Sequence, residues 1–160
     1  MDDANAPHGD LEPLLFLLGT WRGEGVGGYP TMDGFRYGEE VTFRHNGKPF
    51  LAYTQKTWSL DDGRPLHAET GYWRPQPDGT VEVVLAHPTG IAEIYYGTVS
   101  GQRVDIATDA VVRTSSAKEV TALKRLYGLV EGTLMYAVDM AAVGEPLQSH
   151  LSATLERVGD

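Results

Sequence analysis

Two histidines lie in alternating stretches of the chain where an imidazole could act as a ligand or as a base. His150 lies in LQSHLSATLERV, residues 147–158, on the face that carries the polar residues. His67 lies in PLHAETGYWRP, residues 65–75, on the same face as Glu69. Neutral imidazole binds zinc, copper and iron, so both side chains are candidate ligands. Alternation alone favours a plainer interpretation, in which the leucines of residues 147–158 face a core and His150 faces solvent.

The other three histidines give weaker signals. His8 lies near the N-terminus, His45 is next to an Asn-Gly turn, and His87 comes directly before a proline in a predicted turn. No H-x-x-x-H pattern and no His/carboxylate spacing of a facial metal site appears, so the spacing gives little support to a polyhistidine metal site. There is also no Ser-His-Asp order, no glycine-rich phosphate loop and no paired-carboxylate motif.

Composition excludes several classes of function. The formal net charge is −9 and no cluster of Lys and Arg offsets it, which argues against nucleic acid and anionic membranes as partners. The absence of cysteine excludes thiolate chemistry, iron–sulfur clusters and covalent haem attachment, and it is compatible with a reducing compartment. The first ten residues lack a basic start and an apolar run, and LLFLLG is too short to cross a bilayer. We therefore expect a cytoplasmic protein.

A short helix is predicted before the strands that carry these histidines. The stretch GDLEPLLFLLG predicts a helix over residues 11–18, because leucines recur at spacings of three and four. Asp10 is the predicted N-cap and Gly19 the predicted stop.

The rest of the chain alternates like strands separated by turns. Asn46-Gly47, Asp62-Gly63 and Asp78-Gly79 are strong hairpin signals. The pattern predicts an all-β fold, an up-and-down antiparallel β-barrel of about ten strands with a short N-terminal helix. Residues 1–9 are predicted to be a flexible tail and residues 10–160 a single barrel domain. A barrel of this size is too wide for side chains alone to fill, so it should hold a ligand cavity.

The stretch GTWRGEG follows the predicted helix. Gly19, Trp21, Gly23 and Gly25 share one face of a strand. Glycines at this spacing let a strand bend and let another backbone approach closely. A large indole at the start of the first strand is expected to plug one end of the barrel.

Three motifs in order carry a family resemblance: LLGTWRGEGVGGYPT, HAETGYWRP and QSHLSATLERV. Over about residues 10–158 the chain resembles the nitrobindins, ten-stranded antiparallel barrels that bind haem b in a shallow, solvent-open pocket. The resemblance implies one haem b per chain. It implies that His150 is the proximal iron ligand, that His67 lies on the other side of the pocket, and that Thr31 and Lys124 lie near the haem.

The same resemblance implies an activity. It predicts ferric haem that isomerises peroxynitrite to nitrate and binds nitric oxide reversibly, with no catalytic residue beyond the haem iron. Two other classes fit the residues: a haem-free barrel that carries an apolar small molecule, and a structural barrel whose cavity is vestigial. A visible absorption spectrum separates the first interpretation from the other two.

The final strand creates a conflict between pattern and resemblance. If His150 points into the cavity, strict alternation places Leu147, Leu151 and Leu155 on the outer face. Contiguous exposed apolar residues tend to be covered. We therefore expect this row to pack against the helix at residues 11–18 or across a homodimer interface.

Overall fold

The structure is a computed structural model that describes residues 5–159, and in this range a 3₁₀-helix, η2 (Gly9–Leu17), precedes ten β-strands. The strands are β1 (Gly19–Tyr29), β2 (Met32–Arg44), β3 (Leu51–Ser59), β4 (Pro65–Pro75), β5 (Thr80–His87), β6 (Ile91–Ser100), β7 (Arg103–Arg113), β8 (Val120–Val130), β9 (Thr133–Ala142) and β10 (Glu145–Gly159).

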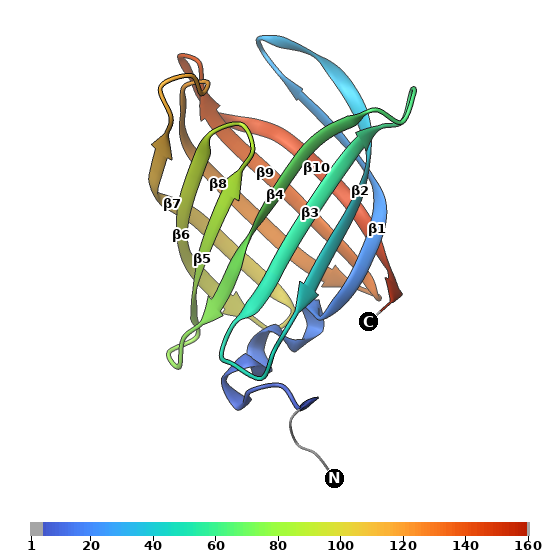
Figure 1. The fold of residues 1–160 in the computed structure, drawn as a ribbon, viewed down its shortest axis with the longest axis vertical. Helices are drawn as coiled ribbons and strands as arrows, with labels where there is room; N and C mark the ends of the chain where they lie inside the picture. Colours follow the sequence, from blue (N-terminus) through green and yellow to red (C-terminus); the bar gives the residue numbers. More distant parts are fainter. Residues whose placement is uncertain (1–4, 160) are drawn as a thin grey trace.

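Each strand pairs antiparallel with its neighbour in the chain, and β10 pairs with β1 to close the barrel (Figure 1). The predicted all-β, ten-stranded up-and-down barrel is confirmed. The predicted turns are confirmed as well, because Gly47, Gly63 and Gly79 have φ values of 87°, 76° and 84°, a region that glycine adopts without steric cost. Closure gives every strand a neighbour on both sides over at least part of its length, which removes most of the exposed edges of an open meander.

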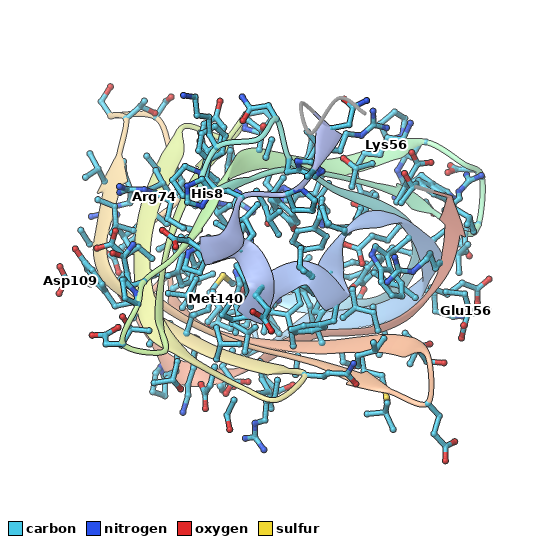
Figure 2. All side chains as sticks on the ribbon, turned by 90° about the horizontal axis from the view of Figure 1, so that it is seen from below. His8, Lys56, Arg74, Asp109, Met140 and Glu156 are labelled. Atoms are coloured by element: carbon cyan, nitrogen blue, oxygen red, sulfur yellow. The ribbon has the colours of Figure 1, made fainter. Side chains whose placement is uncertain are left out.

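The two ends of the barrel differ. The helix η2 contacts β4 and β6 and lies across one end, as seen from below in Figure 2, where Asp109 and Glu156 lie outside the ring. The hairpins β1–β2, β3–β4, β5–β6 and β9–β10 and the β7–β8 connection lie at the opposite end, at the top of Figure 1. We call this the open end. No helix among the described residues is long and apolar enough to cross a membrane.

The helix differs from the prediction in type and in cap. It is a 3₁₀-helix, its N-cap is His8 instead of Asp10, and the His8 side chain accepts a hydrogen bond from the backbone N–H of Asp10. Its buried residues are Leu11, Leu14 and Leu17. This spacing of three matches the three residues per turn of a 3₁₀-helix, whereas the predicted α-helical face included Leu15, which is exposed.

Trp21 is completely buried at the helix end of the barrel. Its indole N–H donates a 2.8 Å hydrogen bond to the carbonyl of Leu17, so it ties β1 to the helix. The guanidinium of Arg157 lies over the indole ring, 4.4 Å from its centroid. The predicted role of Trp21 as a plug is therefore confirmed.

The glycines of β1 allow close approach of β10. A Cβ atom on Gly23 would lie 2.0 Å from the carbonyl oxygen of Thr154, a backbone atom that cannot rotate away. We expect Gly23→Ala to lower the free energy of unfolding by about 1–3 kcal/mol, the usual cost of overpacking. Urea denaturation of both proteins measures the difference.

The matched control is Gly34→Ala on β2. A Cβ atom at Gly34 would meet nothing closer than 3.7 Å, so this variant should change stability by no more than about 0.5 kcal/mol. Equal effects of the two substitutions would contradict the close-approach argument.

Candidate functional site

The strand β10 departs from regular pairing at His150. Ser149 pairs with Asp139 and Leu151 pairs with Val138, so His150 is the extra residue of a β-bulge. A bulge sets two residues of one strand against one residue of the partner and redirects the side chains around it. Strict alternation therefore fails at the residue that the resemblance singles out.

The bulge resolves the conflict over the final strand. Leu155 is completely buried in the barrel core, Ala153 is buried, and Leu151 is half-buried against the same core. Only Leu147, on the other side of the bulge, is exposed, at 47%. The expectation that this row faces outward and needs a cover was wrong for Leu151 and Leu155. The plainer expectation of a solvent-exposed His150 was wrong as well, because this side chain is half-buried.

Three contacts orient the imidazole of His150. Its Nδ1 lies 3.0 Å from the carbonyl oxygen of Gly28, so Nδ1 must carry the proton and donate it. The ring of Tyr29 meets the imidazole edge-on, with 5.6 Å between centroids and 81° between planes. Tyr29 is itself held, since its hydroxyl donates to the carbonyl of Met140 at 2.9 Å and accepts from the N–H of Ala142 at 3.0 Å.

The protonation state of His150 suits a metal ligand. Burial lowers the pKa of His150 below its usual value, the hydrogen bond to Gly28 acts in the opposite direction, and the charge of Arg125 adds a smaller lowering effect. At neutral pH the ring is therefore neutral. With Nδ1–H held by a carbonyl, Nε2 carries the free lone pair, which is the arrangement found in metal-binding histidines. The donor set of this chain thus fits an axial ligand for haem iron.

The barrel wall is divided at the open end. β7 and β8 pair only from Arg103–Gly128 to Ala107–Lys124, although β7 continues along β6 to Arg113. Lys124 lies at the last paired position before the two strands separate, and its side chain is exposed on the outer face between buried Leu123 and Arg125.

The other predicted site residues also belong to the open half of the barrel. Thr31 is exposed in the turn that joins β1 to β2, directly after Tyr29 and Pro30. His67 is near the start of β4 and 33% of its side chain is exposed. The structure records no direct contact between His150 and Thr31, Lys124 or His67.

A buried polar cluster lies on the opposite wall from His150. Arg125 of β8 reaches across the interior and donates to both carboxylate oxygens of Glu69, at 2.7 and 3.3 Å. Burial opposes the charge of Glu69, but Arg125 and the hydrogen bond from His67 hold the pKa of this carboxyl well below its usual range. Tyr53 also donates to Glu69, at 2.9 Å.

The cluster continues to β5 and β6. Nε2 of His87 lies 2.7 Å from Oε1 of Glu93, and Tyr95 donates to the same oxygen at 2.8 Å. Nδ1 of His87 faces Nε2 of His67 at 3.1 Å. The prediction that His87 is a turn residue without a role missed this cluster, because strand register and not spacing in the chain brings His87 beside His67. Arg125 did leave a local signal, since it stands at an inward position between Leu123 and Tyr127.

Glu39 is a third buried carboxyl in the interior, besides Glu69 and Glu93. Burial raises the pKa of Glu39 to about 7, its Oε2 accepts from Gln55 at 2.7 Å, and its Oε1 has no partner. A folded-state pKa above the unfolded value means that ionisation disfavours the fold, so stability is lost as pH rises through the range from 4.5 to about 7.

We therefore expect Glu39→Gln to stabilise the protein relative to the parent at pH 8 and not at pH 4. The difference should reach about 1–3 kcal/mol, since one pKa unit corresponds to about 1.4 kcal/mol. Urea denaturation at the two pH values measures it. A pH-independent difference would contradict the assignment of this pKa to Glu39.

A surface groove of about 1050 Å³ lies outside this site. It runs over the outer face of β1, β10, β9 and β8, and its lining includes Val26, Leu126 and Met135. None of the predicted site residues lines it. Large buried side chains, among them Trp21, Trp73 and Tyr53, fill the barrel toward the helix end. At the open end, Nε2 of His150 has no hydrogen-bond partner among the described residues.

Fold and site together define a β-barrel of the ligand-binding class, with one neutral histidine that presents Nε2 at the open end. The chain belongs to the family of THAP4-like, haem-binding β-barrel domains, whose model matches residues 10–157. The nitrobindin resemblance is thereby confirmed, and haem binding is the property by which this family is described.

Relatives cover almost the whole chain. The peroxynitrite isomerase of Frankia casuarinae is 57% identical and covers 96% of this chain and 88% of its own length. That of a Nocardioides species is 51% identical over 94% of both chains. The crystal structure of Rv2717c from M. tuberculosis superposes with a TM-score of 0.89 at 49% identity, covering 95% of this chain and 99% of the other.

Proposed function

We propose that this chain is a haem-dependent peroxynitrite isomerase in which Nε2 of His150 binds the iron. The observation that carries the proposal is the state of His150: a half-buried, neutral imidazole with Nδ1–H donated to Gly28 and Nε2 free. Relatives that are 50–57% identical over most of the chain carry the name peroxynitrite isomerase, which supports the assignment of the reaction.

The protein has a limited task in this reaction. A bound ferric haem supplies a Lewis acid that converts peroxynitrite to nitrate. His150 holds the cofactor by one bond, and the carbonyl of Gly28 fixes the tautomer and orientation of the ring. The edge contact of Tyr29 prevents the ring from rotating. Isomerisation leaves no net proton to be moved, so the chain needs no general acid and no nucleophile.

The remaining predicted residues take supporting roles in the proposal. Haem b, one per chain, would carry two propionates, and Lys124 at the division between β7 and β8 offers a cation at the edge of the open end. Thr31 offers a hydroxyl on the β1–β2 hairpin, two residues after Tyr29, which packs on His150. His67, on the wall across from His150, would hydrogen-bond a bound ligand or tune its access.

Three further expectations rest on the sequence alone. The same site would bind nitric oxide reversibly, and the lack of cysteine suits a cytoplasmic location. A homodimer remains a prediction, but the leucine row that prompted it is largely inside the barrel. A dimer would therefore have to use another surface.

The competing class is a haem-free barrel that carries an apolar small molecule. Titration of the protein with hemin, followed by visible absorption, separates the two. The proposal predicts a strong band near the violet edge that saturates at about one equivalent. A spectrum that remains that of free hemin would support the carrier.

The reaction itself is tested by mixing hemin-loaded protein with peroxynitrite and following the peroxynitrite absorption in a stopped-flow instrument. The proposal predicts faster decay in proportion to loaded protein and a larger share of nitrate over nitrite. His150→Ala treated in the same way should give the decay of buffer with free hemin. Unchanged decay and unchanged products with the loaded parent would rule the reaction out.

A further inference from the structure

Two histidines and a carboxylate from β4 and β5 converge at the open end, across the barrel from His150. Nε2 of His67 lies 3.1 Å from Nδ1 of His87 and 3.3 Å from Oε1 of Glu69. Nδ1 of His87 lies 3.8 Å from the same oxygen. We propose that His67, His87 and Glu69 form a second, non-haem site for a divalent transition metal such as Zn²⁺.

The three atoms have the spacing of ligands to one ion. A point about 2 Å from each of them lies close to the centre of the triangle that they form, and zinc–nitrogen and zinc–oxygen bonds are roughly 2.0–2.2 Å long. An ion at that point lies close to the plane of its three ligands, so the positions above and below the plane stay open for water. In the metal-free chain a hydrogen bond between the two imidazoles occupies this space.

The side chains that hold His87 and Glu69 form the hydrogen bonds that usually orient metal ligands. Oε1 of Glu93 receives the hydroxyl proton of Tyr95, because Tyr95 accepts from Nε of Arg125 at 2.9 Å. The same carboxylate oxygen faces Nε2 of His87 at 2.7 Å, so Nε2 carries the proton and Nδ1 keeps a lone pair. A carboxylate that holds the far N–H of a histidine in this way is the usual partner of a metal-binding imidazole.

Glu69 is held in a comparable manner. Its Oε2 accepts from Arg125 at 2.7 Å and from Tyr53 at 2.9 Å. These two contacts satisfy Oε2, while Oε1 has only the longer contacts, 3.3 Å to Arg125 and 3.3 Å to His67. Oε1 is therefore the oxygen that is left for an ion.

Charge also favours a cation at this place. Two carboxylates, Glu69 and Glu93, share the buried cluster with one guanidinium, Arg125. With both imidazoles neutral the cluster has a formal surplus of one negative charge, and buried charge that is not compensated is costly. A divalent ion bound by His67, His87 and Glu69 is attracted by this negative charge and brings the formal total from −1 to +1, which a hydroxide at an open position of the ion would cancel. The partly exposed side chain of His67 provides the route from solvent.

The inference does not depend on the proposed iron ligand His150, although a metal ion on His67 would replace the role toward a bound ligand that the proposed function gives to this side chain. β5 lies on the opposite side of the ring from β10, so the metal ligands and His150 are on different walls. The test therefore uses the full chain without haem, both as the parent and as His150→Ala, which lacks the proposed iron ligand. Zn²⁺ is titrated by calorimetry, and Co²⁺, which has visible absorption bands when nitrogen and oxygen ligands bind it, is titrated as a spectroscopic probe.

We expect one Zn²⁺ per chain in both proteins and a Co²⁺ spectrum of nitrogen and oxygen ligation. His67→Asn and His87→Asn should each weaken Zn²⁺ binding by at least about 100-fold, and Glu93→Gln by about 10–100-fold, as losses behind a metal ligand do. His45→Asn, a histidine next to the β2–β3 turn and outside the cluster, should leave Zn²⁺ affinity unchanged. Circular dichroism confirms that each variant is folded, and if one does not fold, the other ligand variant decides.

Two outcomes would overturn the inference. One is the absence of saturable Zn²⁺ binding by the parent. The other is binding that survives in a folded His67→Asn or His87→Asn variant, or that is lost equally in His45→Asn, since either result places the ion elsewhere. If the parent does not bind haem, the proposed function is contradicted and this inference is unaffected.

Discussion

Replacing His150 by alanine is expected to remove most haem binding and leave the barrel folded. The substitution deletes Nε2, which has no hydrogen-bond partner among the described residues and is oriented at the open end through Gly28 and Tyr29. Loss of residues that merely support a metal ligand costs about 10–100-fold in affinity, so loss of the ligand itself should cost at least about 100-fold. Hemin titration by visible absorption measures the change.

The fold should survive because His150 is half-buried and makes a single hydrogen bond to a carbonyl. A matched control is His45→Ala, which removes an imidazole outside the site and should leave hemin affinity unchanged. Equal spectra and affinities for His150→Ala and the parent would show that His150 is not the ligand. His67 would then become the candidate.

Replacing Trp21 by alanine is expected to lower the free energy of unfolding by about 3–5 kcal/mol, the range for large buried aromatic residues. The indole is completely buried, it donates to the carbonyl of Leu17, and Arg157 lies over its face. Its loss leaves a cavity at the end that η2 closes and frees the helix from β1. Denaturation in guanidinium chloride measures the loss.

The control for this prediction is Trp58→Ala. Trp58 is half-buried on the outer face, where the guanidinium of Arg22 lies 5.4 Å from its ring centroid. Its removal leaves no closed cavity, so the cost should be clearly smaller. A loss below about 1 kcal/mol for Trp21→Ala, typical of surface substitutions, would contradict its role as the plug.

The fold was predictable from the sequence because its signals are local. Alternation marks each strand, and Asn-Gly and Asp-Gly mark hairpins because glycine alone adopts positive φ there without cost. Trp21 could be placed because it directly follows the helix and begins a strand whose alternate positions are glycine. The type of helix could not be predicted with the same certainty, since leucine at residues 11, 14, 15, 17 and 18 fits a spacing of three as well as one of three and four.

The site was only partly predictable. Because of the bulge at His150, Leu155 faces the interior whereas Leu147 faces outward. No glycine or proline marks the bulge in the sequence. Only the family resemblance placed His150 at a binding site. The proximity of His67 and His87 depends on how β4 and β5 pair, which single-strand patterns do not contain. Arg125 could have been recognised, because a charged residue at an inward position needs a buried partner.

The most direct test of the central claim is a crystal structure of the hemin-loaded protein. We predict that haem lies at the open end, with Nε2 of His150 bound to the iron. The Nδ1–H group of His150 should still donate its hydrogen bond to the carbonyl of Gly28. The bulge between Ser149 and Leu151 should be retained. Iron bound by His67, or haem bound in the outer groove over β1, β10, β9 and β8 with His150 free, would contradict it.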